Sequence, residues 1–343
     1  MIFFIKNLFR PEVIKPIVKE DFFIPKNELV FNKLYKLGNK YPNKTFYVIK
    51  KYFAPNGFFS NLTFVISHYK FALSKKYIPI VDMKNFVTIY NEKKMIDKCF
   101  NAWEYYFEQL SEYKLEDVYN SKKVIFSGNE KLSKSNLDEN YKLKKFIKKI
   151  KIKKKIYLEY SKLKKKIFKP GLKILGVLVT GTMQKVVRGH ALPLQPRTLV
   201  NEIEKIFNNH KSNKVFLVTE DNSYLREFKK KFDKKLIYLH RPRSTINPFF
   251  SHNLHFENYF RKFHRYKLGK EILIDALLLT NADVFVGSVS NVTRFVKIYS
   301  SVRQKTYDIV TENNSYNRFL ARWNWYLKVY LSFFFKKITY VIK

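Results

Sequence analysis

Hydrophobic and polar residues alternate along the second half of the chain as they do where strands and helices follow one another. Apolar runs of strand length cover 173–180, 214–219, 236–239 and 283–287. Segments with apolar residues at helical spacing lie between them, at 197–208, in the basic stretch after 222 and at 272–279. This alternation predicts a parallel sheet covered by helices, with ligands bound at the carboxyl ends of the strands. We therefore expect an α/β fold.

The first part of the chain carries the same signals in a less regular order. Apolar residues at helical spacing predict helices over 58–75 and 115–120. Short apolar runs predict strands over 77–82 and 124–127, the first of which ends in the carboxylate of Asp82. We interpret residues 1–128 as a separate α/β domain.

Between the two parts, lysines separated by Ile, Leu and Tyr dominate the segment 130–169, which contains neither Gly nor Pro. Such a pattern predicts one long basic amphipathic helix that ends before Pro170. The resulting domain prediction is an N-terminal domain at 1–128, a basic helical linker at 129–171, a second α/β domain at 172–312, and a basic aromatic helix at 313–343.

The last stretch mixes aromatic residues with Lys328, Lys336 and Lys337. It suits an interfacial helix on acidic lipid and, equally, a terminal helix docked on the body of the protein. No run of about 18 uncharged apolar residues is present, and the N-terminus lacks the features of a signal peptide. We expect a cytoplasmic protein and leave open a peripheral position on the inner face of the membrane.

The charge of the chain favours anionic partners. Lys and Arg total 67 against 28 Asp and Glu, a formal charge of +39. Phosphorylated substrates, acidic lipid and nucleic acid all fit this charge, but no nucleic-acid-binding motif is present, so we disfavour nucleic acid. The single cysteine, Cys99, excludes an intrachain disulfide and a multi-cysteine zinc site, and we expect no metal.

Three loops that follow predicted strands are rich in small hydroxyl, glycine and acidic residues: Thr180-Gly181-Thr182, Thr219-Glu220-Asp221-Asn222 and Ser288-Val289-Ser290-Asn291. At a strand-to-helix turn such residues expose backbone N–H groups beside a helix N-terminus, where phosphate binds. Their common place at one sheet edge predicts a nucleotide or sugar-phosphate site. Neither a Rossmann glycine triplet nor a Walker lysine motif is present, which disfavours dinucleotides and ATP hydrolysis.

Several segments resemble a family of bacterial glycosyltransferases linked to capsular and other surface polysaccharides. The resemblance lies in Asn101–Gln109 (Asn-Ala-Trp-Glu-Tyr-Tyr-Phe-Glu-Gln), in Asp82–Asn85 before it, and in Gly189-His190 with the prolines that follow. The second half is similar, more distantly, to core fucosyltransferases and rhizobial nodulation fucosyltransferases. The resemblance implies a GT-B-like fold, with two Rossmann-like domains facing across a cleft. It also implies inverting, metal-independent transfer from a GDP-sugar, which is a donor substrate rather than a cofactor.

The resemblance assigns roles to individual residues. Asp275 matches an acid that recognises guanine, and Glu220-Asp221 matches an acidic pair after a strand. The donor-binding strand end and loop correspond to Asp283, Ser288, Ser290 and Asn291. On the acceptor side we expect Asp82, Asn85, Trp103 and Glu104.

One departure affects the chemistry. The family's first strand ends in an arginine that stabilises charge on the leaving diphosphate, whereas this chain has Thr180, followed by Gly181, Thr182 and Met183. A threonine donates one neutral hydrogen bond and does not replace a guanidinium. Either another cation takes the role, for which we consider Lys185 and Arg188 and favour Arg241 or Arg243, or catalysis is weak or lost. His190 is our candidate for the base that accepts the acceptor hydroxyl's proton.

These observations predict a glycosyltransferase that moves fucose or a related sugar from a GDP-sugar to a surface polysaccharide or lipid-linked oligosaccharide. The alternative is a degenerate relative that binds glycan or nucleotide without catalysis, because Thr180 and Met183 depart from the family pattern.

Overall fold

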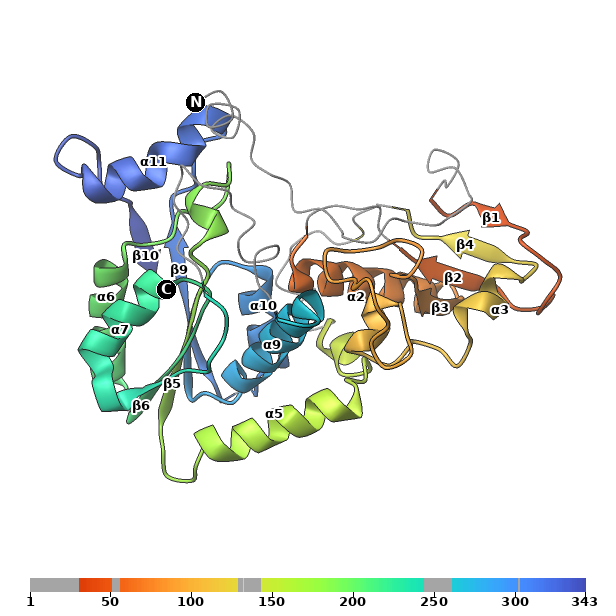
Figure 1. Ribbon diagram of the computed structural model, residues 1–343, viewed down its shortest axis with the longest axis horizontal. Helices are drawn as coiled ribbons and strands as arrows, with labels where there is room; N and C mark the ends of the chain where they lie inside the picture. Colours follow the sequence, from red (N-terminus) through yellow and green to blue (C-terminus); the bar gives the residue numbers. More distant parts are fainter. Residues whose placement is uncertain (1–30, 51–55, 129–131, 133–142, 244–260, 302) are drawn as a thin grey trace. The chain divides into compact units, whose positions relative to one another are not determined.

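The computed structural model describes residues 31–50, 56–128, 132, 143–243, 261–301 and 303–343 (Figure 1). The chain divides into two compact units. By its described residues, the N-terminal unit takes the chain up to Glu159 together with Arg261–Leu273, and the C-terminal unit takes the remainder. The unit boundary falls inside a helix, and a short later segment returns to the N-terminal unit. No helix within the described ranges has both the length and the apolar character needed to span a bilayer.

The N-terminal unit is built on a four-stranded sheet of order β1-β4-β2-β3, in which β4, β2 and β3 are parallel and β1 is antiparallel. Its elements in chain order are β1 (Leu34–Tyr35), β2 (Phe46–Ile49), α2 (Phe58–Ser74), β3 (Ile78–Val81), the 3-10 turn η2 (Ala102–Tyr105), α3 (Leu115–Tyr119), β4 (Val124–Phe126) and the start of α5 (Lys154–Ile167).

Alternation along β2 explains how this sheet is covered on both faces. Phe46 and Val48 belong to a buried cluster with Val118 of α3. Tyr47, on the opposite face of the strand, is fully buried, and its hydroxyl is 2.8 Å from Nδ1 of His68 in α2. Because successive side chains of a strand point to opposite faces, one strand packs against both helices.

The C-terminal unit is built on a six-stranded sheet of order β10-β9-β8-β5-β6-β7, parallel except for β10. Its elements in chain order are β5 (Ile174–Val179), the 3-10 turn η3 (Met183–Lys185), α6 (Pro196–Asn209), β6 (Lys214–Thr219), α7 (Asn222–Phe232), the 3-10 turn η4 (Asp233–Lys235), β7 (Leu236–Ile237), the end of α9 (His264–Leu279), β8 (Val284–Ser288), α10 (Asn291–Tyr299), β9 (Lys305–Thr311), α11 (Arg318–Tyr330) and β10 (Tyr340–Ile342).

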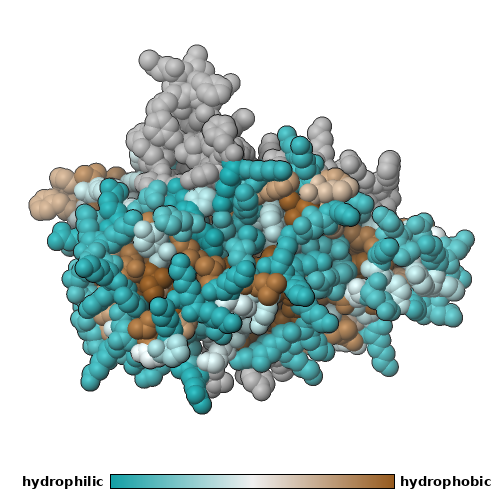
Figure 2. Space-filling model, turned by 60° about the horizontal axis from the view of Figure 1, so that its bottom comes forward, coloured by the Kyte–Doolittle hydropathy of each residue, from teal (hydrophilic) through white to brown (hydrophobic). Residues whose placement is uncertain are grey.

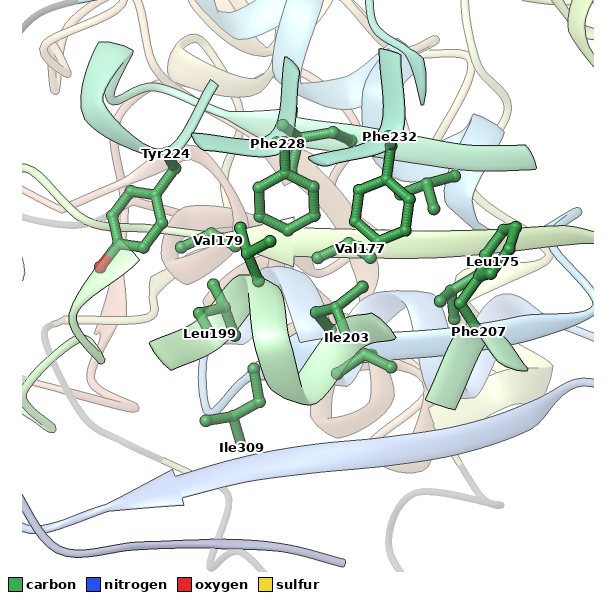
Figure 3. Close-up of a cluster of buried hydrophobic side chains, with 14 of the residues drawn as sticks. Leu175, Val177, Val179, Leu199, Ile203, Phe207, Tyr224, Phe228, Phe232 and Ile309 are labelled. Atoms are coloured by element: carbon green, nitrogen blue, oxygen red, sulfur yellow. The ribbon is translucent and has the colours of Figure 1, made fainter. Parts of the chain in front are cut away.

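One face of this sheet packs against α6 and α7. Val177 and Val179 of β5 contact a cluster that includes Ile203 of α6 and Phe228 of α7 (Figure 3). The strand order reverses at β5, because β6 follows on one side and β8 lies on the other. Ligands of open parallel sheets bind outside the carboxyl ends of the strands at such a reversal. The fold therefore places the expected site beyond Val179 and Ser288.

The α/β class predicted for both halves is confirmed, and each unit has the parallel-sheet architecture that a GT-B-like fold requires of it. The helices expected at 58–75 and 197–208 and the strand at 214–219 are present within one residue of their predicted bounds.

The single long helix expected over 130–169 is wrong in the described part of that segment. Residues 143–147 are helical, a turn follows at 148–150, and α5 begins only at Lys154. Ile152 forms a bridge with Phe107, and Lys151 O accepts a hydrogen bond from Glu108 N. These tertiary contacts interrupt a helix that no Gly or Pro in the sequence breaks.

The C-terminal stretch is helical only in part. α11 ends at Tyr330, and Tyr340–Ile342 form β10, an edge strand antiparallel to β9. Trp325 of α11 is buried, and its Nε1 donates to Pro193 O at 2.6 Å. The helix is thus docked on its own unit, as one of the two sequence interpretations requires.

Candidate functional site

The carboxyl edge of the C-terminal sheet gathers most of the expected donor-site residues. Thr180 follows β5, Glu220 and Asp221 follow β6, Arg241 and Arg243 follow β7, and Ser288 ends β8. The strands that carry them are parallel and adjacent, so their ends meet at one edge.

At the reversal point, two hydroxyl groups meet across the strand ends. Thr180 Oγ1 lies 3.1 Å from Ser288 Oγ. Both residues line a small cavity of about 20 Å³ that also touches Gln184, Leu192 and Thr311. That volume suits a water molecule and not a nucleotide. A nucleotide at this edge would therefore have to lie outside the cavity.

The loop after β5 is tied to the loop after β6. Thr182 Oγ1 donates to Glu220 Oε1 at 2.5 Å. Lys185 forms an ion pair with Asp221, and both side chains are almost fully buried, at 2% and 0% exposure. The other oxygen of Asp221 accepts from Ser223 N at 2.7 Å and caps α7. Lys185, one of the cations considered for the diphosphate, is thus placed in the interior.

Gly181 is required by the close approach of β5 to α7. A Cβ at this position would lie 2.6 Å from Cε2 of Tyr224 and 3.3 Å from Oδ2 of Asp221. The Tyr224 hydroxyl donates to Leu194 O, and burial together with the Asp221 carboxylate raises the pKa of Tyr224 well above its usual value. The loop therefore rests on a packed aromatic ring.

The segment after β7 carries the two favoured arginines in different settings. Nη2 of Arg241 donates to Oδ1 of Asp275 at 2.9 Å, and its Nε lies 3.3 and 3.4 Å from the two carboxylate oxygens. The two side chains are 16% and 8% exposed. Arg243 instead donates to three backbone carbonyls, those of Thr219, Arg241 and Leu239. Arg243 thus fixes the segment against the end of β6, while Arg241 meets the acid assigned to guanine.

The loop after β8 begins α10 with a side-chain cap. Ser290 Oγ accepts from Thr293 N at 3.1 Å, and Asn291, the first helical residue, is exposed. Gly287 lets Thr293 approach, since a Cβ there would lie 2.8 Å from Thr293 Oγ1. This helix N-terminus stands next to the hydroxyl pair at Ser288.

Asp283 is not brought to this edge. It precedes β8, where its Oδ2 accepts from Ile174 N at 2.8 Å at the start of β5. The length of β8 separates it from Ser288, so it lies at the amino edge of the sheet, opposite the other donor-loop residues.

His190 lies on the loop that returns from β5 to α6. Its side chain is exposed, and its carbonyl accepts from Asn314 N at 2.7 Å, just beyond the end of β9. Gly189 before it has φ +69° and packs against Tyr316. The left-handed backbone and the pairing with the β9 loop hold His190 at the rim of the same edge.

The expected acceptor-side residues lie in the N-terminal unit and are engaged in hydrogen bonds there. Asp82 accepts from Asn85 N and Nδ2, each at 2.9 Å, and from the Tyr119 hydroxyl at 2.6 Å. Trp103 is buried, and its Nε1 donates to Glu108 O at 3.0 Å.

The segment Asn101–Gln109 covers the outer edge of β3, the last strand in the order of its sheet. Gln109 Oε1 accepts from Val81 N at 2.8 Å, and Asn101 Nδ2 donates to Val81 O at 2.8 Å. Glu104 Oε1 in turn accepts from both amide side chains, at 2.9 and 3.3 Å. Asn101 and Gln109 thus hydrogen-bond the backbone of Val81 as a neighbouring strand would.

Sequence reasoning missed Asn314, which connects the loops at this edge. It is 1% exposed, and its Nδ2 donates to Ala321 O at 2.9 Å and to Val187 O at 3.2 Å. The polar run Asn313-Asn314-Ser315 after an alternating segment was the available signal. Across the described ranges, no group of three or more His, Cys, Asp or Glu side chains is arranged to hold a metal ion.

Comparisons with known proteins give matches only among solved structures, since no family model and no curated protein matches the chain. The fucosyltransferase NodZ from Bradyrhizobium aligns with 14% identity over 78% of this chain and 96% of its own, with a TM-score of 0.46. POFUT1 in its apo form aligns with 10% identity over 78% and 99%, with a TM-score of 0.45. A mutant of Arabidopsis thaliana FUT1 in complex with GDP aligns with 11% identity over 79% and 72%, with a TM-score of 0.45.

Proposed function

We propose that this chain is a glycosyltransferase whose GDP-sugar donor binds at the carboxyl edge of the C-terminal sheet. The observation that carries the proposal is the meeting of strand-end hydroxyls at the point where strand order reverses. Thr180 and Ser288 lie 3.1 Å apart there, beside the Ser290-capped start of α10. Hydroxyls and a helix N-terminus together favour a diphosphate at this place.

We assign guanine recognition to Asp275, because this residue matches the guanine-recognising acid of the fucosyltransferases that the second half of the chain resembles. The edge of guanine that pairs in nucleic acids presents N1–H and N2–H donors, and a carboxylate accepts both. Arg241 orients this carboxylate, and a carboxylate has enough lone pairs to accept from an arginine and a base together. Arg241 also brings guanidinium N–H groups to the donor site, whereas Lys185 is held in its buried ion pair with Asp221.

A panel of nucleotides on Asp275→Asn tests this assignment. Asn keeps the shape of Asp but replaces one acceptor with a donor that opposes guanine. We expect GDP affinity, measured by calorimetry, to fall at least about tenfold while ADP and UDP affinities change little. Glu271→Gln is the matched control, because Glu271 lies one turn earlier on α9 and pairs with Arg261 at 2.7 Å in the other unit.

Two other outcomes of the panel contradict parts of the assignment. Equal weakening of all three diphosphates would mean that Asp275 only orients Arg241. Wild-type protein that binds no nucleotide would remove the donor site altogether.

We propose inverting transfer of fucose or a related sugar without a metal, with His190 as the base and Arg241 as the cation near the leaving diphosphate. His190 is exposed at the rim, where an acceptor hydroxyl has access. Release of GDP from GDP-fucose in the presence of glycan acceptors measures this activity. We expect His190→Asn to lower kcat and leave GDP affinity unchanged.

A non-catalytic relative is the second candidate, and one observation favours it. The family's arginine is replaced by Thr180, whose hydroxyl is taken up by Ser288, and the nearby Lys185 is paired with Asp221. GDP binding without turnover on any donor sugar would support this candidate.

For the acceptor we propose a surface polysaccharide or lipid-linked oligosaccharide of a bacterium, reached from the cytoplasmic face of the membrane. The N-terminal unit is the proposed acceptor side, where Asp82, Asn85, Trp103 and Glu104 shape the region around the end of β3. The positive charge of the chain suits both a phosphorylated lipid carrier and an acidic membrane surface. Product analysis by mass spectrometry with lipid-linked acceptors tests this proposal.

A further inference from the structure

The loop that follows α11 exposes an unusual run of aromatic side chains. Residues 331–337, Leu-Ser-Phe-Phe-Phe-Lys-Lys, are called the aromatic loop here. Phe333 is 94% exposed and Phe334 is 79% exposed, and their rings meet edge to face at 5.4 Å. Tyr330 before the loop is 70% exposed. We propose that this loop docks the protein on an anionic lipid bilayer by inserting its phenylalanines among the headgroups.

Both ends of the aromatic loop are held by the C-terminal unit. On one side, Lys328 of α11 pairs with Glu312 at 2.7 Å, and Trp325 is buried. On the other side, Thr339 N donates to Glu312 Oε1 at 2.9 Å, and β10 pairs with β9. Within the loop, Phe334 N and Phe335 N donate to Leu331 O at 2.9 and 3.0 Å. The exposed rings therefore project from a folded turn on a fixed base.

Charge around the loop identifies the partner. From Arg318 to Lys343 the sequence contains six cationic residues and no Asp or Glu. Lys336 and Lys337, which follow the phenylalanines directly, are exposed. Exposed aromatic rings beside lysines match the boundary between headgroups and acyl chains, and each lysine adds attraction to acidic lipid.

The exposed apolar surface of the aromatic loop costs free energy in water, and insertion into a bilayer would remove that cost. The loop lies beyond the end of α11 in Figure 1, and apolar atoms project at the same side of the molecule in Figure 2. Leu331, at 45% exposure, adds to the apolar surface of the loop itself. Exposed apolar surface gathered in one loop marks an interaction site.

Flotation of the full chain with lipid vesicles tests the proposal. Vesicles of phosphatidylcholine with phosphatidylglycerol are compared with vesicles of phosphatidylcholine alone. We expect binding to the acidic vesicles, reduced at least about tenfold by Phe333→Ser with Phe334→Ser. Lys336→Gln with Lys337→Gln should lower binding about thirtyfold on acidic vesicles only, at about 1 kcal/mol per lysine. The Phe334→Trp variant places a new tryptophan in the aromatic loop. Brominated lipid should quench more tryptophan fluorescence in this variant than in the wild type.

Leu158→Ser is the matched control, because Leu158 is 50% exposed on the lysine-rich helix α5. Its binding should equal that of the wild type. The proposal is overturned if the Phe333/Phe334 variant binds like the wild type, or if the wild type binds neither kind of vesicle. The proposal is also overturned if the wild type forms dimers and binds no vesicles while the Phe333/Phe334 variant is monomeric. The loop would then mediate self-association instead.

This inference rests on the part of the proposed function that places the enzyme at a membrane, and the two fail separately. All the variants leave the donor edge unaltered, so GDP affinity should remain at the wild-type value. If the protein binds vesicles but not GDP, the proposed donor site is wrong and the membrane-docking role of the aromatic loop still stands.

Discussion

The buried ion pair of Lys185 and Asp221 offers the strongest single test of how the candidate site is held together. Both side chains are almost completely shielded from water, at 2% and 0% exposure. Lys185 Nζ also lies 4.5 Å from the centre of the Trp325 ring, so the cation contacts α11 as well as the loop after β6. Replacing one member leaves the other charge buried without compensation.

The expected magnitude follows from that burial. Lys185→Met should destabilise the C-terminal unit by about 3–5 kcal/mol, because the Asp221 carboxylate loses its partner. Asp221→Asn keeps the acceptor that caps α7 but strands the lysine, and should cost a similar amount. The double variant leaves only an amide in an apolar setting, a cost of about 1–3 kcal/mol. It should therefore be more stable than either single variant.

Urea unfolding measures these differences, followed by fluorine NMR of fluorotryptophan-labelled protein. Trp325 reports on the C-terminal unit and Trp103 on the N-terminal unit. The transition at Trp325 should move, and the transition at Trp103 should not. The reasoning is refuted if the double variant loses the sum of the two single losses, since additive effects would mean that the two charges do not depend on each other.

Three further predictions concern other parts of the structure. Burial lowers the pKa of His210 below its usual value. The stability that this histidine contributes is therefore present above about pH 6.5 and is lost as pH falls through the lowered pKa. The urea midpoint at Trp325 should drop on acidification, and His210→Gln should reduce that drop. Gly181→Ala should cost about 1–3 kcal/mol through its clash with Tyr224, whereas Gly57→Ala, which meets nothing within 4 Å, should change the melting temperature little. Asn101→Ala should lower the urea midpoint at Trp103 by the equivalent of about 1–3 kcal/mol, because the buried Asn101 side chain accepts from Met83 N and is one of two donors to Val81 O; a midpoint equal to that of the wild type would contradict the edge-capping role.

Strands and helices with unbroken apolar patterns could be predicted from the sequence alone. Lys214–Thr219 forms the strand that its apolar run predicts, because five of its six residues are buried in the sheet. By contrast, Lys305–Thr311 was not predicted as a strand. Most of its side chains are only partly buried, which leaves a weak pattern, and its pairing with β8 and β10 stabilises it.

The sequence predicted at which edge of the sheet the site residues lie, but not which partners their side chains contact. The loops after β5, β6 and β8 were expected at one edge, and the parallel pairing brings them there. Which cation would be available was not predictable. Lys185, Arg241 and Arg243 are all basic residues near strand ends, yet one is buried with Asp221, one meets Asp275 and one donates to three carbonyls.

The sequence by itself determined the α/β class, the parallel arrangement of the second half and the edge at which a ligand is expected, because apolar periodicity and strand–helix alternation are local properties. Tertiary structure alone decided the break before α5, the place of Asp283 at the opposite edge and the partners of each arginine. Those outcomes depend on which distant residues meet, such as Ile152 with Phe107 or Arg241 with Asp275, and no local pattern encodes such meetings.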